Sequence, residues 1–198
     1  MRPVGAGVEA WVGEPPEDPD ARGPAAQTED VARKILLDQL TGQARTRAEL
    51  AQKLARKNVP PEVAERLLAR FEEVGLVDDE AFARSWVQSR QAGKGLARRA
   101  LAQELRRKGV HDEVAREVLD QVDPDEETEA ARTLVRRKLR SVQRLDRATA
   151  VRRLSGMLAR KGHSASVAFR VVREELDATG HGDASADIDD PGAPDDHP

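Results

Sequence analysis

The chain has 198 residues, of which 35% are charged and 38% hydrophobic, and it contains no cysteine and four histidines. The lack of cysteine excludes disulfides, thiolate zinc sites, iron–sulfur clusters and cysteine nucleophiles, so we expect neither a metal site nor a cofactor. No apolar run approaches the roughly 20 residues of a membrane-spanning helix. Residues 1–30 are acidic and proline-rich and contain no apolar signal core. We therefore expect a cytoplasmic protein without a membrane partner.

The net charge of −3 conceals a segregation of the two signs along the chain. Residues 1–30 carry 2 basic and 7 acidic side chains, and residues 174–198 carry 9 acidic and no basic ones. The residues between these ends have a net charge of +11. A basic body of this kind favours a polyanionic or acidic partner.

Proline divides the chain in the same places. Five of the eleven prolines lie in residues 1–30 and three in residues 191–198. The other three, Pro60, Pro61 and Pro124, precede or open expected helices, where a first-turn residue needs no backbone N–H donor. We predict disordered acidic tails at residues 1–30 and 178–198, around a helical body.

The body contains three copies of one sequence unit. When Leu54, Leu105 and Leu158 are aligned, the residues after them read Ala-Arg-Lys-Asn, Arg-Arg-Lys-Gly and Ala-Arg-Lys-Gly. A leucine stands four residues before each of these anchors, and a Val-Ala pair follows nine residues after each. Leucines four residues apart lie on one face of a helix, so the unit is helical and repeated.

Each unit is expected to contain three helices. In chain order we predict helices at 31–42, 47–57 and 61–74, then 79–91, 96–108 and 113–122, and finally 124–142, 147–161 and 165–177. The units span residues 31–77, 78–123 and 124–177, and the third has about five extra residues in its first helix or the turn after it. The predicted fold is all-α, an elongated and curved tandem array of three three-helix repeats.

Local residue chemistry supports these helix boundaries. Thr46-Arg-Ala-Glu49 and Asp123-Pro-Asp-Glu126 have the pattern of capping boxes. Gly109, Gly162 and Asn58 follow basic last turns and can take the left-handed conformation that ends a helix.

Four stretches between residues 75 and 110 form a recognisable pattern: Gly75–Arg84 (Gly-Leu-Val-Asp-Asp-Glu-Ala-Phe-Ala-Arg), Arg90, Lys94-Gly95 and Glu104–Val110 (Glu-Leu-Arg-Arg-Lys-Gly-Val). Together they resemble the RecX family of bacterial regulators of the RecA recombinase. The resemblance covers roughly residues 31–176. It implies a monomeric array that lies in the groove of the RecA filament on single-stranded and also double-stranded DNA. It further implies that the protein blocks filament extension, promotes disassembly, and lowers ATP hydrolysis and strand exchange. The chain has no tyrosine, so aromatic stacking on bases is not part of this expectation.

Basic residues of the second and third units are the candidate contacts to DNA or to the RecA filament. Asp146 is the only acidic residue between 130 and 162, so charge repulsion is tolerated there. The opposing interpretation is that many of these side chains, most of them arginines, are solvated surface. The candidates are Lys94, Arg98, Arg99, Arg106, Arg107, Lys108, Arg136, Arg137, Lys138, Arg140, Arg144, Arg152, Arg153, Arg160 and Lys161.

Two alternative functions compete with the regulator. A helix-turn-helix-like DNA-binding protein acting without RecA would need a third helix that presents base-reading side chains, and the third helices here are acidic or mixed. An enzyme would need a nucleophile and base, and we identify no catalytic residues. Asp78 and Asp79 are interpreted as a helix cap, and Gly93-Lys94-Gly95 lacks the spacing of a phosphate-binding loop.

Two further residue types are interpreted as structural. Trp86 aligns with Ile35 and Leu134 of the other units, which predicts a core position for it, and Phe82 is interpreted in the same way. His111 and His163 lie in corresponding turns, and two histidines alone do not make a metal site.

Overall fold

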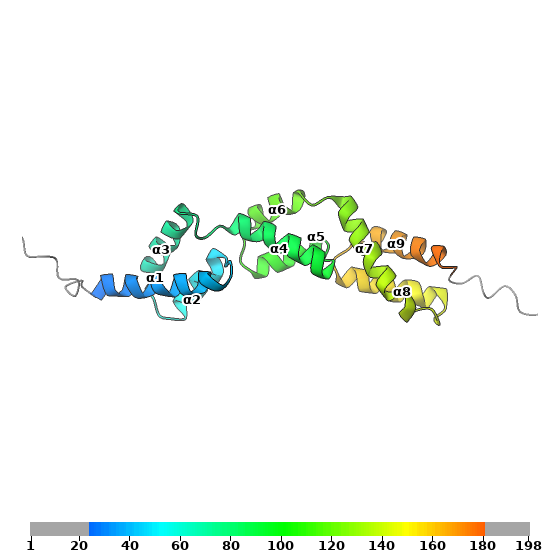
Figure 1. Cartoon of the computed structure of the whole chain (residues 1–198), viewed down its shortest axis with the longest axis horizontal. Coiled ribbons are helices and arrows are strands. Elements are labelled where there is room, and N and C mark those ends of the chain that lie inside the picture. Colours follow the sequence, from blue (N-terminus) through cyan, green and yellow to red (C-terminus); the bar gives the residue numbers. More distant parts are fainter. Residues whose placement is uncertain (1–23, 181–198) are drawn as a thin grey trace, which may run out of the picture.

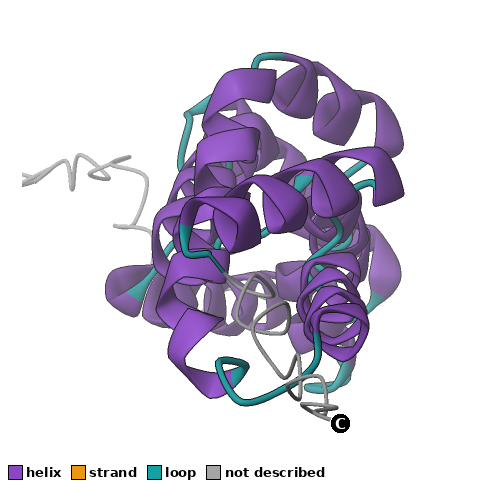
Figure 2. Cartoon of the chain, turned by 90° about the vertical axis from the view of Figure 1, so that its right-hand side faces the viewer, coloured by secondary structure: helices purple, strands orange, loops and turns teal. Residues whose placement is uncertain are grey.

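The computed structural model describes residues 24–180, and all regular structure within this range is helical. Nine α-helices and one short 3-10 helix follow one another along an elongated body, with no strand in the described range (Figure 1). Only short loops connect the helices (Figure 2). The predicted all-α array of three three-helix repeats is confirmed. The residues beyond this range, and with them most of the two predicted tails, lie outside the described part of the chain.

The helices group into three units in chain order. Unit 1 contains α1 (Pro24–Gly42), α2 (Arg47–Ala55) and α3 (Pro61–Glu73); unit 2 contains α4 (Asp79–Lys94), α5 (Arg98–Arg107) and α6 (Asp112–Asp120); unit 3 contains α7 (Pro124–Lys138), the 3-10 helix η2 (Leu139–Ser141), α8 (Arg147–Arg160) and α9 (Ala165–Ala178).

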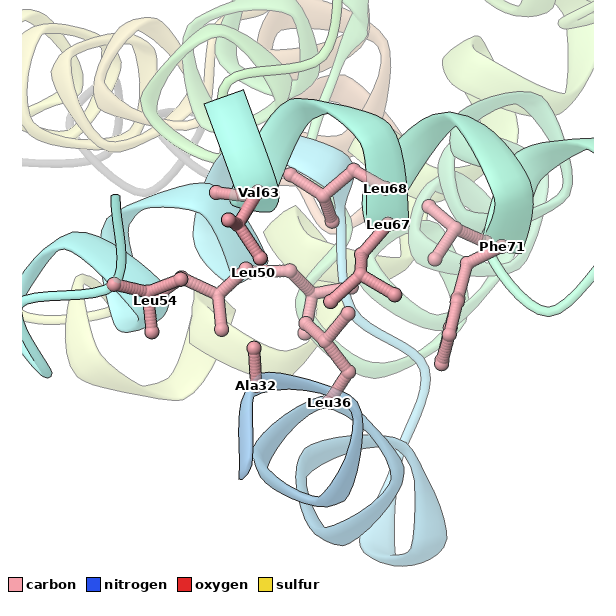
Figure 3. Packing of buried hydrophobic residues seen from close by; sticks show 11 residues of the cluster. Ala32, Leu36, Leu50, Leu54, Val63, Leu67, Leu68 and Phe71 are labelled. Atoms are coloured by element: carbon pink, nitrogen blue, oxygen red, sulfur yellow. The ribbon is translucent and has the colours of Figure 1, made fainter. Parts of the chain in front are cut away.

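Each unit buries a hydrophobic core of its own. In unit 1, Ala32 and Leu36 of α1 lie opposite Leu50 of α2 and Leu67 of α3 (Figure 3). The aligned leucines Leu54, Leu105 and Leu158 are fully buried in all three cores, which explains why the repeat keeps them. Burial of each such side chain contributes about 1.5–3 kcal/mol, so each unit holds itself together through a few leucines and valines.

Two boundaries differ by more than three residues from those expected. The first helix begins at Pro24 rather than at residue 31, so residues 24–30 are not part of a disordered tail. Proline suits the first helical turn, and Glu29 in this segment pairs with Arg33 at 3.0 Å and with Arg66 of α3 at 2.8 Å. The helix expected at 124–142 ends at Lys138 and tightens into η2, which accounts for part of the extra length of unit 3.

The predicted caps are confirmed except at one helix. Thr46 and Glu49 form a reciprocal capping box on α2, and the Asp78 carboxylate accepts a hydrogen bond from the backbone N–H of Ala81 at 2.8 Å. The box expected at Asp123 is wrong, because the Asp123 side chain accepts from the N–H of Asp125 and no reciprocal bond is made. Proline at the first helical position has no N–H, so the N–H of Asp125 is the first backbone donor of this helix.

The turns after the three middle helices are left-handed, as predicted. Asn58, Gly109 and Gly162 have φ values of 56°, 78° and 91°. Gly109 and Gly162 also lie against the preceding unit, because a Cβ on Gly109 would be 2.3 Å from the Cβ of Ala48 and one on Gly162 would be 2.6 Å from the backbone nitrogen of Ala100. Glycine is therefore required at these two positions for close approach as well as for conformation.

The contact between consecutive units, called here the joint, is built in a similar way at both places. In the first joint, Thr46 Oγ1 donates to the Lys108 carbonyl at 2.6 Å, and the Arg47 backbone N–H donates to Asp79 at 2.8 Å. The ammonium group of Lys108 pairs with Glu49 at 2.7 Å. The joint thus connects the start of a middle helix to the next unit's turn and first helix.

Corresponding groups form the second joint. The Ala97 N–H donates to the Lys161 carbonyl at 2.9 Å, and the Arg98 N–H donates to Glu127 at 3.2 Å. His163 is added here, with its Nε2 at 3.2 Å from the Gly95 carbonyl and its side chain buried. Because buried backbone groups are paired across both joints, adjacent units are held in a defined orientation.

Candidate nucleic-acid interface

The structure divides the fifteen candidate basic residues by whether an acidic group already neutralises them. Four of them are held in intramolecular ion pairs: Arg98 with Asp120, Arg106 with Asp112 at 3.2 Å, Lys108 with Glu49 at 2.7 Å, and Arg136 with Glu175 at 2.8 Å. Arg107 lies at the 4.0 Å limit from Glu104. These side chains already have counter-charges within the protein, which reduces the positive charge available to bind an acidic partner.

Three more candidates contact uncharged groups of the protein. Lys161 donates to the Lys94 carbonyl at 2.9 Å, Arg99 donates to the Ala159 carbonyl at 3.4 Å, and Arg152 lies 3.5 Å from the Thr149 hydroxyl. The Lys94 side chain itself is exposed. The first two contacts span the second joint, so Lys161 and Arg99 help to hold units 2 and 3 together.

The six remaining candidates lie on consecutive elements of unit 3, and we call them the unpaired cluster. Each is exposed, and no carboxylate within residues 24–180 lies in ion-pair distance of any of them. The cluster follows the end of α7, η2, the turn after it and α8 of unit 3. Its members are Arg137, Lys138, Arg140, Arg144, Arg153 and Arg160.

A hollow of about 210 Å³ opens within the unpaired cluster. Lys138, Arg153 and Arg160 line it together with the apolar side chain of Met157. The Ser141 hydroxyl, also in its wall, donates to the Lys138 carbonyl at 2.7 Å and closes the turn of η2 at the end of α7. Three cations around one small hollow fit an anionic oxygen group such as a phosphate better than an apolar ligand.

Helix caps and buried faces position this cluster. Asp146 caps α8 by accepting from the Thr149 N–H at 2.9 Å, and this hydrogen bond lowers the pKa of the Asp146 carboxyl. Val142 and Leu154 are buried beneath the cluster. The basic side chains are thus held at the surface by elements whose opposite faces are fixed in the core.

In a continuous helix, residues four apart such as Arg136, Arg140 and Arg144 would share one face, but Arg136 departs from this arrangement. It turns to α9, where its hydrogen bond with Glu175 raises the pKa of the Arg136 guanidinium. Glu175 is buried and also lies 3.4 Å from Arg132. Since the helix ends at Lys138, the spacing rule no longer holds for Arg140 and Arg144.

Trp86 lies at the first joint rather than wholly inside the core. Its ring stacks on Phe82 at 5.5 Å, and the Arg90 guanidinium and the Lys108 ammonium lie 4.0 and 4.7 Å from its centroid. Its indole N–H donates to Glu104 at 2.9 Å. The prediction of a structural residue is supported, while the partners Arg90 and Glu104 were missed because sequence spacing does not indicate contacts between helices.

The interpretation of Asp78 and Asp79 as structural residues is supported by geometry. Asp78 caps α4, and Asp79 accepts the Arg47 N–H across the joint, while burial raises the pKa of the Asp79 carboxyl.

Within the described ranges, no three His, Asp or Glu side chains gather as metal ligands would. A search of the described helices finds none long and apolar enough to cross a membrane.

Comparison with family models accounts for the repeat. The models described as the first, second and third three-helix domains of RecX match residues 32–71, 78–119 and 125–172. The chain belongs to the RecX family. The proteins named Regulatory protein RecX from Streptomyces coelicolor and Thermobifida fusca are each 52% identical to it. These alignments cover 85% of both chains for the first, and 80% of this chain and 87% of the relative for the second.

Solved RecX structures share the architecture. The crystal structure of RecX from Lactobacillus salivarius has a TM-score of 0.72 at 20% identity and covers 77% of this chain and 99% of that one. A second crystal structure of a regulatory protein RecX has a TM-score of 0.69 at 26% identity, over 76% of this chain and 73% of that one. The resemblance inferred from the sequence is confirmed, and the chain is a RecX-family regulatory protein.

Several of the residues that carry the family resemblance lie at the first joint. Asp79 binds the Arg47 N–H, Lys108 pairs with Glu49, and Gly109 permits the approach to Ala48. These positions therefore maintain the arrangement of the units. The six candidates of the unpaired cluster lie elsewhere, in unit 3.

Proposed function

We propose that this protein is a non-enzymatic inhibitor of the RecA recombinase that binds in the groove of the RecA filament on DNA. Bound there as a monomer in the cytoplasm, it blocks filament extension and promotes disassembly, and so lowers ATP hydrolysis and strand exchange. Family membership supports the regulatory role. The observation that carries the proposed mode of binding is the unpaired cluster at one end of an array whose joints hold it extended.

The unpaired cluster supports contact with DNA, because its like charges repel one another and a phosphate backbone would relieve that repulsion. Arg137, Lys138 and Arg140 lie within four residues of one another and have no internal counter-charge in the described part of the chain. Each phosphate that such a group neutralises releases condensed counterions, which lowers the logarithm of the binding constant by about 0.7 per contact and per decade of salt for single strands, and about 0.9 for the duplex. Binding to single-stranded DNA, and also to duplex, would thus be strongly salt-dependent.

A DNA-binding protein that acts without RecA is the alternative. It would read base edges with exposed polar side chains of a recognition helix. The third helix of unit 2, α6, instead exposes Asp112, Glu113, Glu117 and Asp120, which a DNA groove would repel. This favours the regulator, because DNA contact through the cluster positions the protein without reading sequence.

The test is the rate of ATP hydrolysis by RecA on single-stranded DNA, measured with increasing amounts of the full chain. Wild-type protein should lower the rate, and the variant R137E/R140E/R144E should need a higher concentration for the same inhibition. The matched control is K34E/R56E/R116E, which makes the same change in net charge at exposed residues of units 1 and 2 that lie within ion-pair distance of no carboxylate in residues 24–180.

Two results would contradict this proposal. If wild-type protein leaves RecA hydrolysis unchanged but binds DNA with a preference for one sequence, the alternative function holds. If both triple variants weaken inhibition equally, inhibition depends on the net charge of the protein and the unpaired cluster has no special role.

A further inference from the structure

An apolar groove lies between α8 and α9 at the far end of the array. Its volume is about 810 Å³, and its walls include Val151, Ala159, Ala165 and Phe169. Phe169 is 51% exposed and is the aromatic residue among the large hydrophobic side chains that the described part leaves in solvent. Exposed apolar area of this kind is unfavourable in water and marks a binding surface when it is contiguous.

The equivalent groove of unit 2 shows that the repeat does not require an apolar surface here. Aligned on Leu105 and Leu158, Phe169 corresponds to Arg116, Ala159 to Arg106, and Ala165 to Asp112. The groove of unit 2 is smaller, about 330 Å³, and its walls carry these charged side chains. Unit 3 has thus exchanged charge for apolar surface at positions where folding permits either.

Two arginines flank the apolar floor. Arg152 and Arg173 line the groove, and neither lies within ion-pair distance of a carboxylate in residues 24–180. A third, Arg147 at the end of the groove, pairs with Asp177. The ligand that complements this surface is a short segment with an apolar side chain between acidic ones, because guanidinium groups bind carboxylates in directed hydrogen bonds.

The chain itself contains such a segment directly after α9. Residues 181–198 include six aspartates and no lysine or arginine, and their one large aliphatic residue, Ile188, stands in the sequence Asp187-Ile188-Asp189-Asp190. We infer that residues 181–198 fold back into the groove, with Ile188 against Phe169 and the flanking aspartates facing Arg152 and Arg173.

The distances permit this return. From Ala178 back to Phe169, α9 rises about 14 Å at roughly 1.5 Å per residue. The eight residues from Gly180 to Ile188 span up to about 26 Å when extended. The acidic N-terminal residues are a poorer occupant, because they precede α1 at the opposite end of the array (Figure 1).

Because residues 181–198 belong to the same chain as the groove, even a weak contact is enough to keep the groove occupied part of the time. A short flexible connection gives the segment an effective concentration in the millimolar range, so a segment with a millimolar dissociation constant would occupy the groove about half of the time. High salt screens the carboxylate contacts but leaves the apolar contact of Ile188 and Phe169 in place. Partial loss of occupancy at high salt is therefore expected.

The absence of cysteine from the full chain permits a direct test. A nitroxide attached to a single cysteine in the variant S185C should broaden the backbone NMR signals of Ala159, Ala165 and Phe169. The signals of Ala102 and Arg116, in the equivalent groove of unit 2, should be unaffected. Broadening in neither groove, or in both equally, would overturn the inference.

Two substitutions in the labelled protein distinguish binding in the groove from non-specific electrostatic attraction of the acidic segment to the basic body. F169D should abolish the broadening, whereas V74D, which places the same charge at a similarly exposed apolar position of unit 1, should leave it intact. Far-UV circular dichroism checks that both variants remain helical. If broadening survives F169D and lies instead on Lys138, Arg153 and Arg160, the tail binds the unpaired cluster and the groove assignment is wrong. Broadening that fades on dilution would identify a second copy as the occupant and would also overturn the inference.

Discussion

Replacing Gly162 with alanine should separate units 2 and 3. Gly162 has φ +91°, and an added Cβ would lie 2.6 Å from the backbone nitrogen of Ala100 and 2.7 Å from its Cβ. The atoms in the way belong to the backbone and Cβ of α5, so they cannot rotate aside as the end of a long side chain would. The variant must either distort its own turn or open the second joint.

Two costs add in this variant. The left-handed conformation costs a residue with a Cβ about 1–2 kcal/mol, and an overpacked contact costs about 1–3 kcal/mol more. Gly75 provides the matched control, because it has φ +72° and nothing within 4 Å of its added Cβ. G75A should therefore lose only the conformational part, and the difference between the two variants measures the contact across the joint.

The assay is urea denaturation of both variants, followed by far-UV circular dichroism. G162A should be less stable than G75A by about 1–3 kcal/mol, the cost of overpacking. Its transition should also be broader, because units that no longer support each other unfold separately. Equal stability of the two variants would refute the claim that close approach at Gly162 holds the joint together.

Two further predictions concern the second joint and the third unit. Burial, the largest cause, lowers the pKa of His163, so the folded protein favours the neutral ring, and stability present above the usual pKa near 6.5 should be lost as the pH falls below it. In urea titrations H163Q should lose less stability than wild type between pH 7.5 and 5.5, and identical losses would contradict this account. A chain that ends at residue 122 should remain helical by circular dichroism but lose most inhibition of RecA, since contacts in a repeat array are mainly between neighbours. Inhibition equal to that of the full chain would show that unit 3 and its unpaired cluster are dispensable.

The repeat could be predicted because its determinants are local. Buried leucines four residues apart, the capping box at Thr46 and left-handed residues such as Gly109 act within one or two turns of the chain. The start of α1 at Pro24 escaped prediction because the segment is acidic and contains proline, which are also the features of a tail. Its contact with Arg66 of α3 is distant in sequence and outweighs that composition.

The candidate interface could be predicted only as a region. Composition indicates an excess of positive charge in units 2 and 3, but it does not distinguish Arg136, which pairs with Glu175, from Arg137, which has no partner in the described residues. That distinction depends on which helix faces which, and on a helix that ends at Lys138 instead of continuing. The pairing of Arg98 with Asp120 likewise required the packing of α5 on α6.

The residue Asn58 has a consequence for assembly. It occupies the turn of unit 1 that corresponds to Gly109 and Gly162, and its left-handed backbone is the same. At Gly109 even a single added carbon would meet the neighbouring unit at 2.3 Å. With an asparagine side chain in that place, we expect a steric clash if unit 1 of one molecule joins the end of another molecule in the way that units 2 and 3 join their predecessors. We therefore predict that the protein does not form fibres by repeating its internal joint, so that the number of repeats in one particle does not change with protein concentration.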